Sequence, residues 1–182
     1  MAVLGHIIKA IITAQDAIKN ESNPIEEQLQ VLNELLETAK NTKFGTHYTF
    51  EKILREENTA KAFAKNVPYF DYDGMHKNWW SKLHEGEEDV TWPGIPDYYA
   101  LSSGTTGKRS KRIPVTKEMI SAIRNAGIQQ VFALSNFDMP SDFFETGILM
   151  LGSSTDLTEK DNHLEGEISG ISASKIPSWF SG

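Results

Sequence analysis

The chain has 182 residues, of which 39% are hydrophobic and 24% charged, proportions that exclude general disorder and are typical of a globular domain. Its formal net charge is −7, so it lacks the sustained positive field with which proteins gather nucleic acid, and we expect no nucleic-acid partner. It has no cysteine, which excludes disulfides and thiolate chemistry and fits a reducing, cytoplasmic compartment.

An amphipathic helix that covers a core is expected over residues 4–18. His6, Lys9 and Gln15 interrupt the apolar run too soon for a signal peptide, so we expect no targeting segment and no membrane partner. A helix on a membrane surface is the alternative, although only Lys9 and Lys19 line the polar side. The apolar residues that share one helical face are Leu4, Ile7, Ile8, Ile11, Ile12 and Ile18.

The second helix has a clear start signal at Asn23. This side chain can accept from the free amides of the first turn, Pro24 has no amide to lose, and Glu26 can reach back. The predicted buried stripe of this helix consists of Leu29, Leu32, Leu35, Leu36 and Ala39.

Short helices are expected from there to residue 66. Gly45 is a natural helix terminator, and Thr49 and Thr59 are the predicted caps of the next two helices. Val67 should be extended, because the ring of Pro68 disfavours helical geometry in the residue before it.

A further helix is expected over residues 73–84, after which the chain changes character. Met75, Trp79, Trp80 and Leu83 are spaced to share its buried face, and Gly86 lies just beyond its end.

The sequence then predicts two short strands, over residues 98–101 and 112–115, with a polar loop between them. A long helix is expected to begin at Thr116. Helices first, followed by strands mixed with helices, predict an α/β fold with an N-terminal helical subdomain.

The loop between the two strands combines the groups that bind polyphosphates. Backbone amides turned toward one point, short hydroxyl side chains and a cation that reaches the outer oxygens hold phosphates best. Gly104 and Gly107 allow the backbone to approach a ligand closely. The hydroxyl donors are Ser102, Ser103, Thr105 and Thr106, and the cations are Lys108, Arg109, Lys111 and Arg112.

This loop differs from the Walker A phosphate loop, in which four residues separate the first glycine from a Gly-Lys-Ser/Thr ending. Here only two residues separate Gly104 from Gly107, and an arginine follows Lys108. The composition alone also fits a simple turn with solvated basic side chains, so the residue types leave both interpretations open.

The order of residues from Ser102 to Thr116 resembles the phosphate loop of adenylate-forming enzymes, the superfamily of acyl-CoA synthetases and luciferases. Lys111 follows Gly107 by one residue more than in most of that superfamily, and a proline-containing strand comes next. This pattern is similar to the Gretchen Hagen family of auxin- and jasmonate-conjugating acyl-acid amido synthetases. Lys108 departs from this pattern, because the family usually has glycine there.

The stretches FGTHYTF, KNVPYFDYDGM and GEISGISASKIPSWF also resemble bacterial members of the family, so the resemblance covers the chain from Pro24 onward.

The resemblance implies an enzyme that uses ATP and Mg²⁺ to convert a carboxylic acid to an acyl-adenylate, which an amine or amino acid then attacks to form an amide. Lys111 is the implied catalytic cation, and no metal ligand of this chain is implied. Trp79, Trp80 and Trp92 line an acyl pocket or pack in the core, and both alternatives stay open. The implied nucleotide-binding residues are Ser102, Ser103, Gly104, Thr105, Thr106, Gly107, Lys108 and Lys111.

The resemblance also implies a large adenylating domain, a mixed sheet flanked by helices, of which this chain contains the start. We expect a helical region over residues 1–90 and the first part of the nucleotide-binding domain over residues 91–182. The family's adenine and ribose motifs and its carboxy-terminal lid have no counterpart here, so we expect an N-terminal fragment that is inactive alone. A partial sheet exposes an edge that invites association. The alternative is a catalytically silent module that binds a protein partner.

Overall fold

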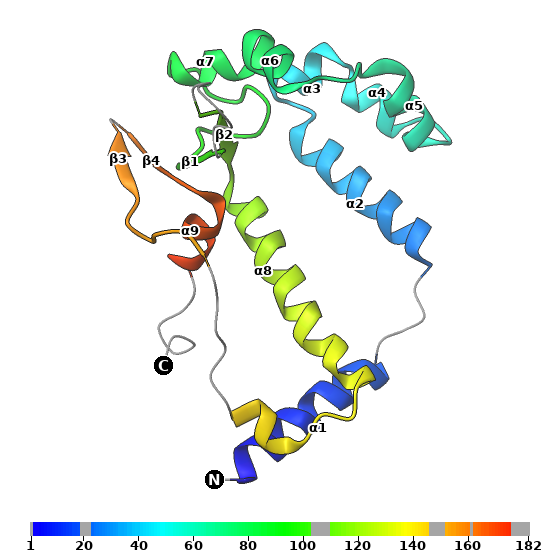
Figure 1. Ribbon diagram of the computed structural model, residues 1–182. Helices are drawn as coiled ribbons and strands as arrows, with labels where there is room; N and C mark the ends of the chain where they lie inside the picture. Colours follow the sequence, from blue (N-terminus) through cyan, green and yellow to red (C-terminus); the bar gives the residue numbers. More distant parts are fainter. Residues whose placement is uncertain (1, 19–22, 103–109, 146–151, 161, 176–182) are drawn as a thin grey trace.

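The computed structural model describes residues 2–18, 23–102, 110–145, 152–160 and 162–175, and Figure 1 shows their arrangement. Helices occupy the chain up to residue 84, and a small four-stranded mixed sheet with further helices follows. The predicted α/β class is therefore confirmed.

The second helix, α2 (Pro24–Ala39), begins as predicted. The Asn23 side chain accepts a hydrogen bond from the Ile25 N–H at 3.1 Å, and the proline occupies the first turn, where no amide is needed. The short helices that follow are α3 (Lys43–His47), α4 (Phe50–Leu54), α5 (Thr59–Asn66), α6 (Tyr72–Met75), the π-helix η1 (His76–Trp80) and α7 (Ser81–His84).

Predictions for the ends of these short helices are partly wrong. Gly45 lies inside α3 rather than at a helix end; a Cβ there would lie only 2.0 Å from the carbonyl oxygen of Ala39, so the close approach of α2, not helix termination, requires the glycine. Asn58, not Thr59, caps α5, since its side chain accepts a backbone N–H of the first turn. Thr49 precedes α4 as expected, but its backbone is left-handed (φ 54°) and its side chain makes no capping hydrogen bond.

The segment from residue 72 to residue 84 is helical, with the π turn of η1 in its middle. Trp79 and Leu83 are buried in a core, and Met75 and Trp80 pack against it, so the predicted shared face is confirmed. Gly86 follows the end of α7 with a φ of 84°, the left-handed conformation that favours glycine after a helix.

The helical part packs around an aromatic core in which the Phe44 ring centroid lies 5.0 Å from that of Trp79. Only part of the predicted α2 stripe reaches this core, because Leu29 and Leu35 are 36% and 49% exposed. The buried members are Leu36, Ala39, Phe44, Phe50, Ile53, Trp79, Leu83 and Val90.

The sheet confirms both predicted strands and adds two. The strands β1 (Tyr98–Leu101) and β2 (Arg112–Val115) pair antiparallel, whereas β4 (His163–Gly166) pairs parallel with β1 and antiparallel with β3 (Thr158–Lys160). The strand order is β2-β1-β4-β3, so β2 and β3 are the edges of the sheet within the described residues; association through an edge stays a prediction. Helix α9 (Ile168–Ala173) packs against β1. A second core consists of Tyr98, Ala100, Val115, Ile120 and Ile171.

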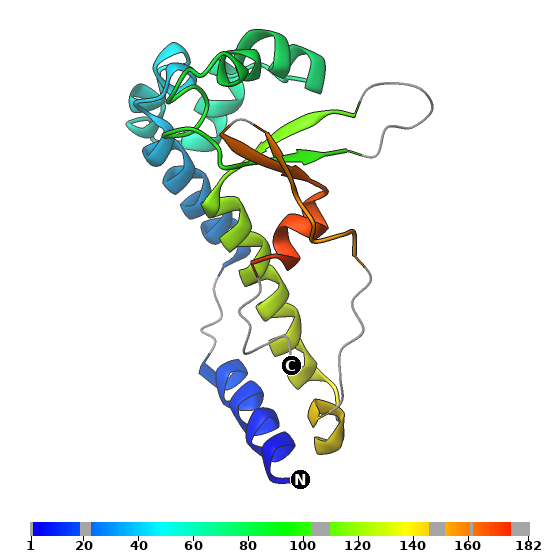
Figure 2. The same cartoon turned by 90° about the vertical axis from the view of Figure 1, so that its left-hand side faces the viewer.

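A long helix, α8 (Lys117–Phe132), leaves the sheet directly after β2. Its predicted cap is confirmed, because the Thr116 side chain accepts a backbone N–H of the first turn. The helix runs to the opposite end of the molecule, where α1 (Ala2–Ile18) packs against the 3₁₀ helices η2 (Ala133–Asn136) and η3 (Ser141–Glu145) (Figures 1 and 2).

The first helix forms where predicted, but most of its apolar face covers no core. Leu4, Ile7 and Ile11 are 60%, 51% and 53% exposed, and Ile12 is 3% exposed. The reason is that the short helices η2 and η3 are too small to bury a whole helical stripe. Among the described residues, no helix has the length and apolar character needed to cross a membrane.

Candidate functional site

The strands β1 and β2 fix both ends of the predicted phosphate loop. The Ser102 N–H donates to the Lys111 carbonyl oxygen at 3.0 Å, and the Lys111 N–H donates to the Ser102 Oγ at 3.2 Å. The structure thus brings two of the predicted nucleotide-binding residues together across the hairpin. The other predicted residues, Ser103, Gly104, Thr105, Thr106, Gly107 and Lys108, lie outside the described residues, as does Arg109.

The Lys111 ammonium lies over an aromatic ring from the helical part. Its Nζ is 5.0 Å from the centroid of the Tyr72 ring, a cation–π contact. The Tyr72 hydroxyl accepts a hydrogen bond from the Arg112 N–H at 3.0 Å. Because Lys111 is exposed, its charge is available to an anion at the end of the hairpin where the loop begins.

The side chain of Arg112 is held in an ion-pair network on the sheet. Its guanidinium pairs with the carboxylate of Glu165, which is 8% exposed, and its Nη2 lies 2.9 Å from the Nε2 of His163. The same Nε2 lies 3.2 Å from the Glu165 Oε1. This nitrogen accepts from Arg112 when it carries no proton and donates to Glu165 when it does.

A row of rings connects this network to the helical part. The His84 ring stacks on Tyr99 with centroids 4.9 Å apart, and Tyr99 meets His163 at 4.7 Å. On the other side of His84, the His76 ring lies 5.6 Å away. His76 of η1, His84 of α7 and His163 of β4 are thus connected through ring contacts that include Tyr99 of β1.

The electrostatics of this cluster lower two pKa values. Burial, followed by repulsion from the charged Arg112 and from neighbouring histidines, holds the pKa of His84 below its ordinary value of 6.5. Burial alone would raise the pKa of Glu165, but the hydrogen bond with His163 and the charge of Arg112 outweigh it, so this pKa lies below 4.5. Glu165 is therefore a carboxylate at neutral pH.

Sequence reasoning missed the residues that connect the hairpin to its surroundings. The alternation in His163-Leu164-Glu165 was a usable signal, because it places the histidine and the glutamate on one face of a strand. Tyr72 carried no such signal, since it lies 40 residues before Arg112 and meets it only in the folded chain.

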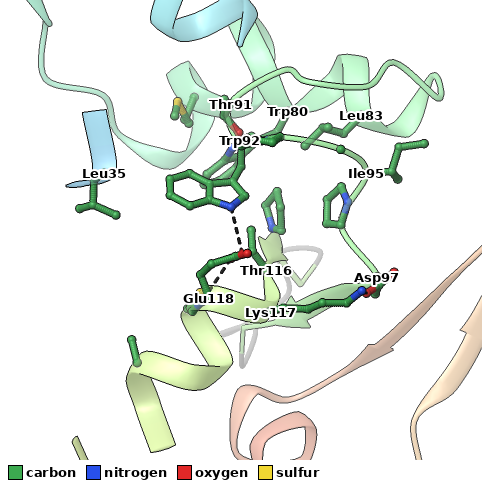
Figure 3. Close-up of a pocket in the computed structure, with 17 residues that line it drawn as sticks. Leu35, Trp80, Leu83, Thr91, Trp92, Ile95, Asp97, Thr116, Lys117 and Glu118 are labelled. Carbon is green, nitrogen blue, oxygen red and sulfur yellow. Dashed lines mark hydrogen bonds and ion pairs between the residues drawn. The ribbon is translucent and has the colours of Figure 1, made fainter. Parts of the chain in front are cut away.

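An open pocket of about 680 Å³ lies between the helical part and the start of α8 (Figure 3). Its walls include Leu83, Met75 and the ring of Trp80, and Trp92 donates from its indole nitrogen to the Glu118 Oε2 at 3.0 Å. Residues before β1 and after β2 line it, so it opens at the end of the hairpin opposite to the loop.

The three tryptophans lie in different surroundings, and an acyl pocket stays a prediction. Trp79 is 7% exposed and belongs to the aromatic core. Trp80 and Trp92 pack against that core and also line the pocket (Figure 3). The pocket opens at the far end of the strands from the loop, and the ring of Tyr72 lies between its wall and Lys111, with its centroid 6.0 Å from that of the Trp80 ring.

Comparison with known proteins gives one match to a protein family. The model of the GH3 family N-terminal domain matches residues 14–179, which includes the hairpin, the helical part and β4. No curated protein and no solved structure matches the chain.

Proposed function

The chain belongs to the GH3 family, the Gretchen Hagen family, and from this membership we propose that it takes part in ATP-dependent activation of a carboxylic acid. In the proposed reaction, the carboxylate attacks the α-phosphate of ATP, which forms an acyl-adenylate and releases pyrophosphate. An amine or amino acid then attacks the acyl carbon, which forms an amide and releases AMP. The observation that carries the proposal is the pairing of Ser102 with Lys111 at the base of a glycine- and hydroxyl-rich hairpin loop.

The chemistry that this loop must supply is the stabilisation of charge. Negative charge grows on the departing pyrophosphate as the carboxylate attacks, so donors and a cation that are already oriented stabilise the transition state more than the ground state. Lys111 is the proposed cation, since its backbone is hydrogen-bonded to Ser102 and its side chain is exposed.

The proposed nucleotide contacts follow the order of the loop. We assign the hydroxyls to the β- and γ-phosphates and the glycines to the close approach of the backbone, with Lys108 and Arg109 as additional cations. The assigned residues are Ser102, Ser103, Gly104, Thr105, Thr106, Gly107 and Lys111.

Mg²⁺ is proposed to enter with the nucleotide, because it commonly binds through substrate phosphates with few protein ligands. In the part of the chain that the structure describes, no group of three His, Asp or Glu residues is close enough to hold a metal ion. Bound there, Mg²⁺ would neutralise part of the phosphate charge.

The substitution Lys111→Ala tests this assignment. In the complete polypeptide as it occurs in its source cells, it should lower the kcat of carboxylic-acid-dependent ATP–pyrophosphate exchange by roughly 30- to 1000-fold, a loss of about 2 to 4 kcal/mol of transition-state stabilisation. Lys65→Ala is the matched control, because Lys65 is an exposed lysine in the last turn of α5. Equal exchange by the Lys111 and Lys65 variants would remove the assignment.

A catalytically silent module that binds a protein partner is the second candidate. It is favoured by the exposed apolar residues of α1, which include Leu4, Ile7 and Ile11. The exchange assay separates the two candidates, since a silent module catalyses no exchange with any carboxylic acid.

A further inference from the structure

The side chain of Tyr72 contacts both Arg112, the first residue of β2, and Lys111, the residue before it. Tyr72 is the first residue of α6, and its hydroxyl accepts from the Arg112 N–H at 3.0 Å. Its ring lies under the Lys111 ammonium, with 5.0 Å from Nζ to the ring centroid. The proposed phosphate-binding lysine is thus tied to the helical part by the side chain of a residue that is distant in sequence.

The hydrogen bond fixes the backbone next to Lys111 because β2 is an edge strand. The Ser102 N–H bonds to the Lys111 carbonyl oxygen, so in this antiparallel pairing the Arg112 N–H points away from β1. On that side the described sheet has no neighbouring strand, and the Tyr72 hydroxyl provides the acceptor. Without this hydroxyl, β2 would lose the hydrogen bond that holds the Arg112 N–H, next to Lys111, on its outer side.

The side chain of Arg112 is fixed independently of Tyr72. Its guanidinium pairs with Glu165 and His163, and its Cζ lies 5.4 Å from the centroid of the Tyr99 ring. Because Arg112 is held in place, the backbone of the adjacent Lys111 is fixed at that end. The ring of Tyr72 limits the directions in which the exposed Lys111 ammonium can point.

We propose that Tyr72 is a positioning residue that orients Lys111 toward the phosphates of the nucleotide. The inference rests on the proposed function, because it requires Lys111 to bind phosphate. Tyr72 acts through the lysine and the β2 backbone. Its hydroxyl holds the backbone of Arg112 in place through a hydrogen bond, and its ring limits the directions in which the Lys111 ammonium can point.

A double-mutant cycle in the complete polypeptide tests this role. The variants are Tyr72→Phe, Tyr72→Leu, Lys111→Ala and the Tyr72→Leu/Lys111→Ala pair, and the readouts are the kcat of ATP–pyrophosphate exchange and the Kd for magnesium pyrophosphate. Tyr72→Leu should lower kcat about tenfold, with the KM for the carboxylic acid changed less than twofold, and the Lys111→Ala effect in that background should be about tenfold smaller than in the wild type.

The conservative variant and a nearby exposed tyrosine serve as controls. Tyr72→Phe keeps the ring and should lose only about threefold in kcat, the share of the hydroxyl. Tyr69→Leu should keep the wild-type values, because Tyr69 lies three residues earlier and is 94% exposed. Thermal unfolding of each variant confirms that it is folded.

The outcomes separate this inference from the proposed function. If Lys111→Ala impairs exchange and pyrophosphate binding but its effect is the same with Leu or Tyr at position 72, Tyr72 is merely structural and only the inference fails. If Lys111→Ala leaves both readouts at the wild-type level, or if the wild type neither exchanges nor binds pyrophosphate, the role of Lys111 fails, and the inference falls with it.

Discussion

Arg112, His163 and Glu165 form a charged network whose members depend on one another. The carboxylate of Glu165 is buried, so removal of its arginine partner would leave a desolvated charge with only His163 beside it. The network therefore contributes less to net stability than to a fixed geometry for β2, and through β2 to the position of Lys111.

The pH dependence of stability follows from His84. Its folded-state pKa lies below 6.5, so the unfolded chain binds more protons as the pH falls below that value, and the free energy of unfolding decreases. Chemical unfolding of this chain should show lower stability at pH 5.5 than at pH 7.5. The variant His84→Phe keeps a ring against Tyr99 and should lose less stability over the same interval.

Equal curves for the wild type and His84→Phe would show that His84 is not the source of this effect. Below pH 4.5 a second loss is expected, because the folded-state pKa of Glu165 is also lowered and its stabilising contribution disappears as the carboxylate is protonated.

At the scale of elements, two glycines in helices should respond to alanine in opposite ways. A Cβ at Gly45 would lie 2.0 Å from the Ala39 carbonyl oxygen, so Gly45→Ala should lower the free energy of unfolding by about 3 kcal/mol. At Gly127, inside α8, no heavy atom other than those of the adjacent residues and the helix's own backbone lies within 4 Å of that position, so Gly127→Ala should raise the free energy of unfolding by about 0.5 to 1 kcal/mol. Urea unfolding measures both, and a similar change in the two variants would contradict the packing of α3.

Helix and strand boundaries were predictable where a local interaction decides them. Asn23 and Thr116 cap their helices as expected, because the capping bond joins residues two or three positions apart. The predictions that Gly45 ends a helix and that Leu35 is buried were wrong, because the surroundings of both residues are formed by other parts of the chain. Gly45 faces the end of α2, and Leu35 is 49% exposed because it lines the open pocket and does not reach the core.

At the scale of the whole molecule, the sheet topology assembles what the sequence keeps apart. The parallel pairing of β1 with β4 brings Tyr99 opposite Glu165, and the packing of α6 brings Tyr72 to β2. The sequence predicted the hairpin and the residues of its loop, because those lie together in one stretch. It could not predict the partners that fix the base of the loop, because no local spacing records a contact between distant segments.

The central claim, that the carboxylic acid is activated at the α-phosphate of ATP, is tested most directly by following oxygen atoms. The complete polypeptide would be given ATP, an amine and a carboxylic acid labelled with oxygen-18 in its carboxylate, and the released nucleotide analysed by mass spectrometry. Attack on the α-phosphate followed by amide formation predicts AMP that carries one labelled oxygen, together with unlabelled pyrophosphate. Release of ADP with the label in inorganic phosphate, or no consumption of ATP with any carboxylic acid, would contradict it.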